Sequence, residues 1–163
     1  MELPSQRKVT AKVYTTAGWI AGTFHVPEVV PFLEFLGGDE DFFTLTDVEL
    51  PRQTSPLPLL ALQRHSTALV IPSADEVGPA PESTTVHQVS CLLDGGVVMG
   101  SLYLPPDLRV SDQLTLSARP GRRFVVLRRC TVGLDQSLPG KAGVETARLA
   151  LVNVERVVGV AEM

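Results

Sequence analysis

The stretch VTAKVYTTAGWIAGTFHVP, from Val9 to Pro27, has a second version in the same chain, HQVSCLLDGGVVMGSLYLP, from His87 to Pro105. The two stretches align at a constant offset of 78 residues without a gap. Chance rarely preserves glycines and apolar positions together, so the sequence predicts a tandem duplication of one module. The coinciding positions include Gly18 with Gly96, Gly22 with Gly100, Pro27 with Pro105, Ile20 with Val98 and Phe24 with Leu102.

Each version predicts a β-hairpin, because apolar residues alternate before the turn and continue after it. The alternation is clear in the run from Val9 to Val13. In the second version Asp94-Gly95-Gly96 is a strong turn signal, because glycine reaches positive φ without steric cost. Gly22 and Gly100 lie inside the second predicted strand of each copy. A missing side chain at that place predicts a bulge or a sharp bend.

The rest of each copy follows one plan. A compact turn or helical segment begins at Pro27 and at Pro105, and a strand follows it. Both copies then close with a strand, a short turn and a last strand, an alignment that sets Leu59 opposite Arg148. About five short strands with turns at close spacing are typical of a small barrel. We therefore expect an all-β protein with minor helical turns, made of two tandem five-stranded Sm-like barrels.

The domain boundaries follow from the stretch between the copies. Residues 73–85 are rich in proline and lack apolar periodicity, which predicts an extended linker. Copy one then spans residues 1–72 and copy two spans residues 86–163. A module of this size has a small hydrophobic core, so we expect the two copies to pack against each other.

The pattern resembles the Sm-like and Src-homology-3-like small barrels, whose first motif is an apolar strand, a turn glycine, an apolar residue and a further glycine. It is most similar to an uncharacterised bacterial family of Sm-like domains, in which an RxSDxL segment and an Fxxl strand follow the hairpin. Copy two has this segment from Arg109 to Leu114, followed by Phe124. Copy one has the run from Val30 to Phe35 in that place. The resemblance implies the barrel fold and no particular activity.

Sm proteins bind RNA through an Asp and an Asn after the first motif and an Arg-Gly pair in the second. Here Asp107 lies beyond the usual spacing from Gly100, and the closing turn from Asn153 to Arg156 contains no Arg-Gly pair. The net charge of −4 also argues against the basic surface that nucleic acid requires. We therefore do not expect a nucleic-acid partner. An RNA-binding protein remains an alternative, and it would use Arg122, Arg123, Arg128 and Arg129.

Charge divides unevenly between the copies. Residues 1–78 hold ten acidic and five basic side chains, whereas residues 79–163 hold eight acidic and nine basic ones. At one position of the repeat the loop before Phe42 is acidic and the loop before Phe124 is basic. Loops of opposite sign on adjoining barrels predict a partner-binding surface, within one chain or head to tail between chains. Its candidate residues are Asp39, Glu40, Asp41, Arg122 and Arg123.

Aromatic residues are dense between Phe32 and Phe43. Most of them should belong to the core, because large apolar side chains are usually buried. An exposed part of this segment, after Pro31, would form a binding patch for a protein partner. Phe32 and Phe35 are therefore further candidates for partner binding.

A second pattern suggests a ligand. Arg119 and Arg123 precede a loop in which Asp135, Ser137 and Gly140 follow the order DxSxxG. The combination resembles the cyclic di-GMP motif of PilZ domains, in which two arginines grip phosphate and guanine while the second loop reads the nucleotide edge. Arginine suits this chemistry because its planar fork binds phosphate and stacks on bases. PilZ domains have a hairpin between the two motifs, whereas one predicted strand separates them here, so a cyclic-dinucleotide sensor is an alternative function.

The sequence holds no complete catalytic, metal or cofactor constellation. His25, His65 and His87 lie apart, without a second ligand at metal-like spacing. Cys91 and Cys130 lie on predicted strands and are expected to be reduced core residues. We therefore expect a protein that is not an enzyme, with no catalytic residue, metal site or cofactor.

Apolar runs fall short of the roughly 18 residues of a membrane span, and the polar start of the chain lacks the apolar core of a secretory signal. We expect a cytoplasmic protein without a membrane partner. The predicted function is a non-enzymatic protein-interaction or assembly adaptor. Its barrel edges and charged loops would bind a protein partner or another copy of the chain.

Overall fold

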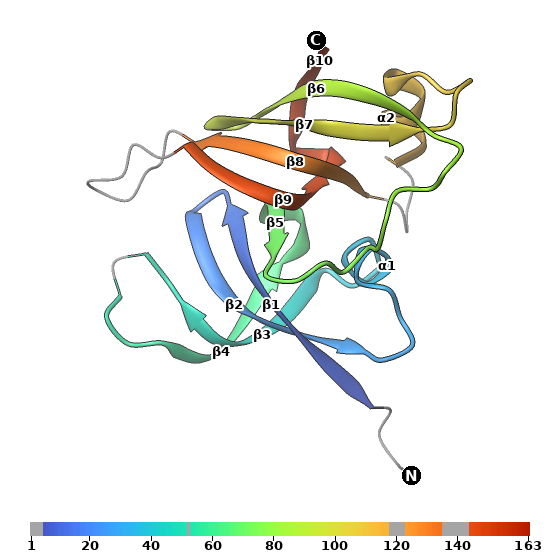
Figure 1. Cartoon of the computed structure of the whole chain (residues 1–163). Helices are drawn as coiled ribbons and strands as arrows, with labels where there is room; N and C mark the ends of the chain where they lie inside the picture. The colour runs from blue at the N-terminus through green and yellow to red at the C-terminus, as the bar shows by residue number, and fades with distance from the viewer. Residues whose placement is uncertain (1–4, 52, 118–122, 135–143) are drawn as a thin grey trace.

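The computed structural model describes residues 5–51, 53–117, 123–134 and 144–163, which form mainly β-strands (Figure 1). Within these ranges ten antiparallel strands make one sheet in the order β10-β6-β7-β8-β9-β5-β1-β2-β3-β4. Two short α-helices and two 3-10 turns interrupt the strands in the same described part of the chain. The all-β class predicted from the sequence is confirmed.

Each half of the chain has the same series of elements: a hairpin, a helix, two further strands, a 3-10 turn and a last strand. In the first half these are β1 (Gln6–Thr15), β2 (Gly18–Pro27), α1 (Phe32–Leu36), β3 (Phe42–Glu49), β4 (Leu57–Gln63), η1 (Arg64–Ser66) and β5 (Thr67–Pro72). In the second half they are β6 (Thr85–Leu93), β7 (Gly96–Leu104), α2 (Val110–Ser117), β8 (Phe124–Leu134), β9 (Val144–Asn153), η2 (Val154–Arg156) and β10 (Val157–Glu162).

The two halves also share one strand order, β5-β1-β2-β3-β4 in the first and β10-β6-β7-β8-β9 in the second. Corresponding residues lie 78 apart in the hairpins, 82 apart in β3 and β8, and 90 apart from β4 and β9 onward. In the closing strands Leu59 therefore corresponds to Leu149, one residue beyond the Arg148 suggested by the sequence. The strand ladders decide this, because Phe42 lies opposite Gln63 and Phe124 lies opposite Asn153.

A bulge lies opposite one glycine of each hairpin, in the strand that follows the hairpin, which is β3 in the first half and β8 in the second. The pairing of β2 with β3 shifts register around Gly22, and that of β7 with β8 shifts around Gly100. Opposite these glycines Asp47 and Arg129 have positive φ values of 51° and 52°. A Cβ atom at Gly100 would lie 3.1 Å from Cys130 Sγ, so the close approach of β8 requires glycine. The predicted irregularity occurs at these glycines, but the extra residue of each bulge lies in β3 or β8 and not in the strand that contains the glycine.

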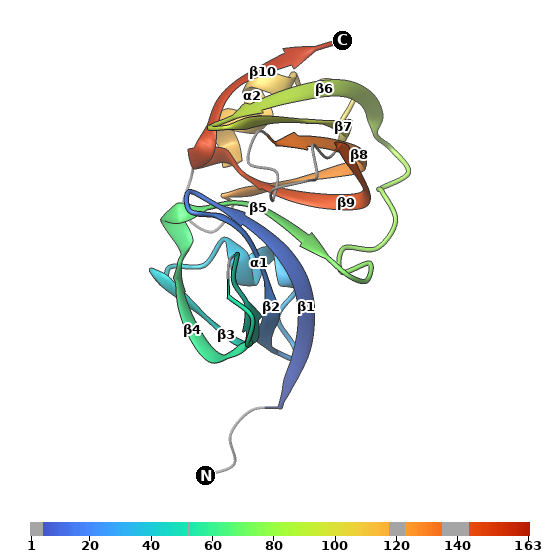
Figure 2. The same cartoon turned by 90° about the vertical axis from the view of Figure 1, so that its left-hand side faces the viewer.

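The sheet continues from one half into the other, because β5 pairs with β9 as well as with β1. Leu69 lies opposite Val152, and Val70 lies opposite Leu151. Figures 1 and 2 show one half above the other, with the chain termini at opposite ends of the molecule. The two tandem barrels are not confirmed, since the described strands form one unclosed sheet. The division into domains at residues 72 and 86 stays a prediction.

Two clusters of buried side chains form the core, and each cluster draws residues from both halves. The residues that enter the other half's cluster are Tyr14, Ala68 and Leu69 from the first half, and Phe124, Leu149 and Leu151 from the second. Their relative exposures are between 0% and 6%. Burial of this kind excludes water from both faces of the β5–β9 pairing, so the halves are packed together as expected.

Polar contacts join the two halves beside the paired strands. We call the contact between residues 64–70 and residues 149–156 the seam. Asn153 is fully buried, and its side-chain amide donates to the backbone oxygens of Thr67 at 2.8 Å and Arg64 at 3.4 Å. Buried carbonyl groups without a donor are costly. Asn153 therefore holds η1 and η2 against each other.

The proline-rich segment 73–85 lies along the molecule and contacts both halves (Figure 1). Arg7 Nη1 forms a 2.6 Å ion pair with Glu76 in this segment. Arg128 of the second half donates from Nη1 to the backbone oxygen of Gly78 at 2.8 Å. Anchored at these points, the segment behaves as part of the structure rather than as a loose tether.

We predict that Asn153→Ala destabilises the fold by about 1–3 kcal/mol, because the Thr67 oxygen loses its 2.8 Å bond from the amide and the Glu155 N–H loses its acceptor, Asn153 Oδ1. The Arg64 oxygen keeps the Thr67 backbone N–H. Urea unfolding followed by circular dichroism measures this free energy. Thr146→Ala, at an exposed position of the same strand, is the matched control and should change stability by about 0.5 kcal/mol or less. An Asn153→Ala variant as stable as this control would show that the seam contact contributes nothing.

The two cysteines are buried core residues, as predicted. Cys91 and Cys130 are each 2% exposed, and both are free thiols. Burial raises the pKa of the Cys91 thiol to about 11 and that of Cys130 to about 12. Their folded-state pKa values exceed the unfolded value of about 8.5. The thiols therefore favour the folded state below about pH 8.5, and this contribution is lost as the pH rises through the folded-state values.

We predict that both thiols of the folded protein resist a thiol-specific reagent at pH 8, where roughly one molecule in a thousand carries a Cys91 thiolate. Labelling in concentrated urea should yield both thiols of the chain, which provides the internal control. Rapid native labelling of even one thiol would contradict the burial described above. Ellman's reagent followed by absorbance makes the measurement.

Candidate functional site: the sheet edges

The acidic loop predicted for partner binding lies between α1 and β3. Asp39, Glu40 and Asp41 are all exposed. The backbone oxygen of Glu40 accepts from Arg64 Nε, and that of Asp41 accepts from the Arg64 backbone N–H, both at 2.8 Å. Arg64 is itself buried, so it fixes the loop through the main chain. The three side chains remain accessible to a partner.

The basic loop is described in part. Arg122 lies outside the described residues, whereas Arg123 precedes β8. Arg123 Nε lies 3.3 Å from Glu155 Oε1, and Glu155 also lies 3.3 Å from His65 Nδ1 across the seam. The structure thus places Arg123 beside a carboxylate of its own half. It does not bring Arg123 together with the acidic loop within the chain.

Phe32 and Phe35 belong to an aromatic cluster inside the first half. Phe32 is fully buried and meets Phe24 edge to face with 5.3 Å between the ring centroids. Phe35 is half-buried and packs on Phe43 at 5.8 Å. A partner cannot reach Phe32 in this arrangement. These rings stabilise the core, as expected for most residues of such an apolar segment.

Most residues of the predicted nucleotide site, namely Arg119, Asp135, Ser137 and Gly140, lie outside the described residues. Of the arginines predicted for RNA binding, Arg128 is engaged with Gly78 and lies 5.8 Å from the centroid of the Tyr103 ring. Arg129 is exposed.

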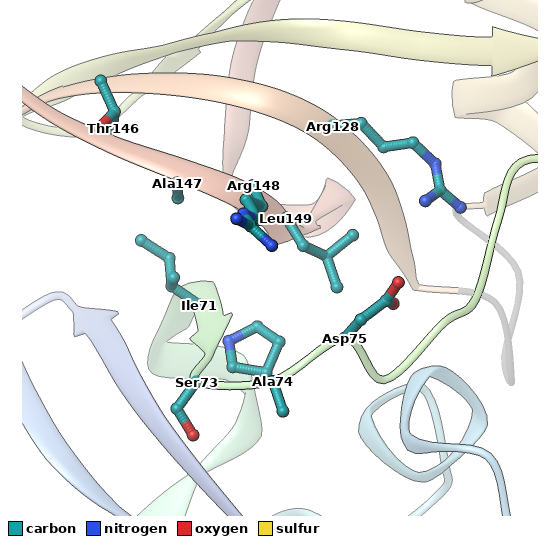
Figure 3. Close-up of a pocket in the computed structure, with 10 residues that line it drawn as sticks. Ile71, Ser73, Ala74, Asp75, Arg128, Thr146, Ala147, Arg148 and Leu149 are labelled. Atoms are coloured by element: carbon teal, nitrogen blue, oxygen red, sulfur yellow. The ribbon is translucent and has the colours of Figure 1, made fainter.

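A pocket of about 340 Å³ opens where β5 and β9 diverge beyond their paired residues (Figure 3). It is lined by Ile71, Pro72, Ser73, Ala74, Asp75, Arg128 and Thr146 to Leu149. Asp75 Oδ1 accepts from two backbone N–H groups of its own loop, those of Val77 and Gly78. Ser73 Oγ donates to the backbone oxygen of Thr10. These polar groups hold the loop, and no described hydroxyl in the pocket is hydrogen-bonded to a general base.

The exposed apolar residues of the outer strands form the most distinctive surface of the described chain. Within the described ranges β4 pairs with β3 alone, and β10 pairs with β6 alone. Leu59 on β4 is 62% exposed and Val158 on β10 is 74% exposed. Phe42 next to β4 and Leu92 next to β10 are 52% and 45% exposed. We call these surfaces the β4 edge and the β10 edge.

The sequence predicts that barrel edges bind a partner, but none of these four residues is among its candidates for partner binding. A signal for them exists in the run LPLLALQ of β4, where apolar residues occupy both faces of the strand. Strands of that composition are usually covered on both sides. Leu59 is nevertheless exposed in this strand, which makes the β4 edge a candidate for partner binding.

Neither helix in the described ranges has the length and apolar character needed to cross a membrane. In the same ranges no three His, Cys, Asp or Glu side chains are grouped so that they could hold a metal ion.

Comparisons with protein-family models, with curated proteins and with solved structures find no significant match for this chain.

Proposed function

We propose that this chain is a non-enzymatic assembly module, built from two diverged Sm-like barrels, that binds a protein partner by strand addition at the β4 and β10 edges. The shared strand order of the two halves and the bulges at corresponding places in β3 and β8 support the duplicated barrel. Fusion through β5 and β9 accounts for the single sheet. The functional surface then consists of the outer edges of β4 and β10, which this fusion leaves without a neighbouring strand in the described ranges.

The exposed apolar side chains on the outer strands carry this proposal. An outer strand presents a row of unpaired backbone N–H and C=O groups, and a strand from another protein satisfies them by adding to the sheet. Natural proteins usually protect such edges with charged residues or proline. β4 has one such residue, Pro58, yet Leu59 beside it and Val158 on β10 stand exposed. Their exposure costs solvation free energy that strand addition recovers.

The acidic loop supports the same function. Asp39, Glu40 and Asp41 adjoin the start of β3, next to the β4 edge, and are held in place by the buried Arg64. Charges at the rim of an interface speed association and reject partners of like sign. A strongly acidic partner would therefore be repelled at the β4 edge.

The first test uses a photo-crosslinking amino acid at position 59 or 158, introduced into the full chain in its own cells. We predict discrete crosslinked adducts from both positions. The matched control is position 29, because Val29 is 91% exposed and apolar but lies in the turn before α1. Crosslinking at position 29 that equals crosslinking at the two edges would overturn the proposed function.

A second prediction concerns affinity for the partner identified in this way. Leu59→Lys should weaken its binding about tenfold or more, because burying this leucine contributes about 1.5–3 kcal/mol. Val29→Lys should leave binding unchanged. Calorimetry with the purified chain and partner measures the difference, and equal affinities of the two variants would exclude Leu59 from the interface.

A further inference from the structure

We propose that the partner is a second copy of this chain, joined head to tail, with the β10 edge of one copy pairing with the β4 edge of the next. The proposal rests on the proposed function, in which the outer strands bind a partner strand, and it names that partner. The seam inside the chain supplies the geometry.

The topology makes the two outer edges complementary. At the seam the first half contributes its last strand, β5, and the second half contributes β9. The counterpart of β5 in the second half is β10, and the counterpart of β9 in the first half is β4. The two outer strands are therefore the two sides of the interface that the chain already forms once internally.

Burial at the seam supports this equivalence. The counterpart of exposed Leu59 is Leu149, which is 6% exposed at the seam. The counterpart of exposed Val158 is Ala68, also 6% exposed. At both positions the residue is apolar in each half and is covered only where the other half packs on it. The outer edges thus carry the apolar residues that this interface buries.

The neighbouring strands repeat the pattern. Phe42 is 52% exposed beside the β4 edge, whereas its counterpart Phe124 is 4% exposed and packs in the core of the first half. Leu92 is 45% exposed beside the β10 edge, whereas its counterpart Tyr14 is 4% exposed and packs in the core of the second half. If these exposed residues were ordinary surface residues, their counterparts in the other half would not be buried at the seam on both edges.

Polar groups at the seam also have a counterpart. Gln63 occupies the position of Asn153 and carries the same amide group on a chain one methylene longer. In the head-to-tail pair this amide faces the 3-10 turn of the preceding copy, where Val154 and Val157 take the places of Arg64 and Thr67. Arg64 and Thr67 are the two residues whose backbone oxygens accept from the Asn153 amide in the seam.

Charge disfavours one symmetric alternative, the pairing of two β4 edges. The β4 edge belongs to the half with ten acidic and five basic residues, and the β10 edge to the half with eight acidic and nine basic residues. Two β4 edges would bring two acidic halves together. A head-to-tail contact is heterologous, so it propagates until a ring closes or a filament grows.

The decisive experiment blocks one edge at a time. Leu59→Glu should block the β4 edge, and Val158→Glu should block the β10 edge. Analytical ultracentrifugation should find wild-type oligomers larger than a dimer, and each variant alone should be a monomer. An equimolar mixture should form a dimer and nothing larger, because one intact edge remains on each chain. Val29→Glu is the matched control and should assemble like the wild type.

Other outcomes overturn the proposal. A monomeric wild type at high concentration would exclude self-pairing, and a Leu59→Glu variant that still dimerises alone would replace it with a symmetric contact. Circular dichroism establishes that each variant is folded, which exposed positions should permit. If the crosslinks from positions 59 and 158 join the chain to a different protein, the proposed function survives and self-pairing fails. If no edge-specific crosslinks form, both fail.

Cysteine pairs test the register. The seam sets Val70 opposite Leu151, so Val160 of one copy should lie opposite Ala61 of the next. The double variant Ala61→Cys with Val160→Cys should form disulfides between chains under mild oxidation. Ala61→Cys with Ala161→Cys is the control, because the next residue points to the other face of the sheet. Equal crosslinking of the two double variants, or none in either, would contradict this register.

Discussion

The backbone pairing of β5 with β9 is the interaction on which the rest of the structure depends. β5 is short and buried, and buried N–H and C=O groups need hydrogen-bond partners. β1 lies on one side of it, and Leu69 and Val70 meet β9 on the other. This short ladder joins two similar halves into one sheet. It also sets the two 3-10 turns together around the buried Asn153 and lets Phe124 enter the core of the first half.

The same pairing explains why the outer strands are the candidate functional surface. The first half uses its β5 edge and the second half uses its β9 edge to join. The remaining edges, β4 of the first half and β10 of the second, therefore lie at the outside of the sheet. Those edges keep the apolar side chains that suit the internal contact, as the exposed Leu59 and the buried Leu149 illustrate. A partner strand would cover these side chains, whereas two charged side chains of the pocket beside the seam, Asp75 and Arg128, already bond to the loop at residues 73–78.

Some parts of this molecule could be predicted because they depend on neighbouring residues. Hairpin turns and the register shifts at Gly22 and Gly100 follow from glycine's lack of a Cβ atom, and the burial of Cys91 follows from strand alternation. The sequence alignment of the closing strands differs from the structural correspondence by one residue. The reason is that β4 has apolar side chains on both faces, so its apolar pattern fits either alignment. Local sequence cannot distinguish an aromatic core from an aromatic surface patch. It therefore makes Phe32 a candidate for the surface, although Phe32 is fully buried.

The sequence by itself determined the two similar halves, their strand-rich composition and the places where the chain turns. Only the tertiary structure decided which strands meet across the halves, and hence that Leu149 is buried while its counterpart Leu59 is exposed. The physical reason is that turns and bulges are chosen by local φ and side-chain sterics. Strand partners are chosen by long-range backbone hydrogen bonds, for which any strand edge offers the same donors and acceptors.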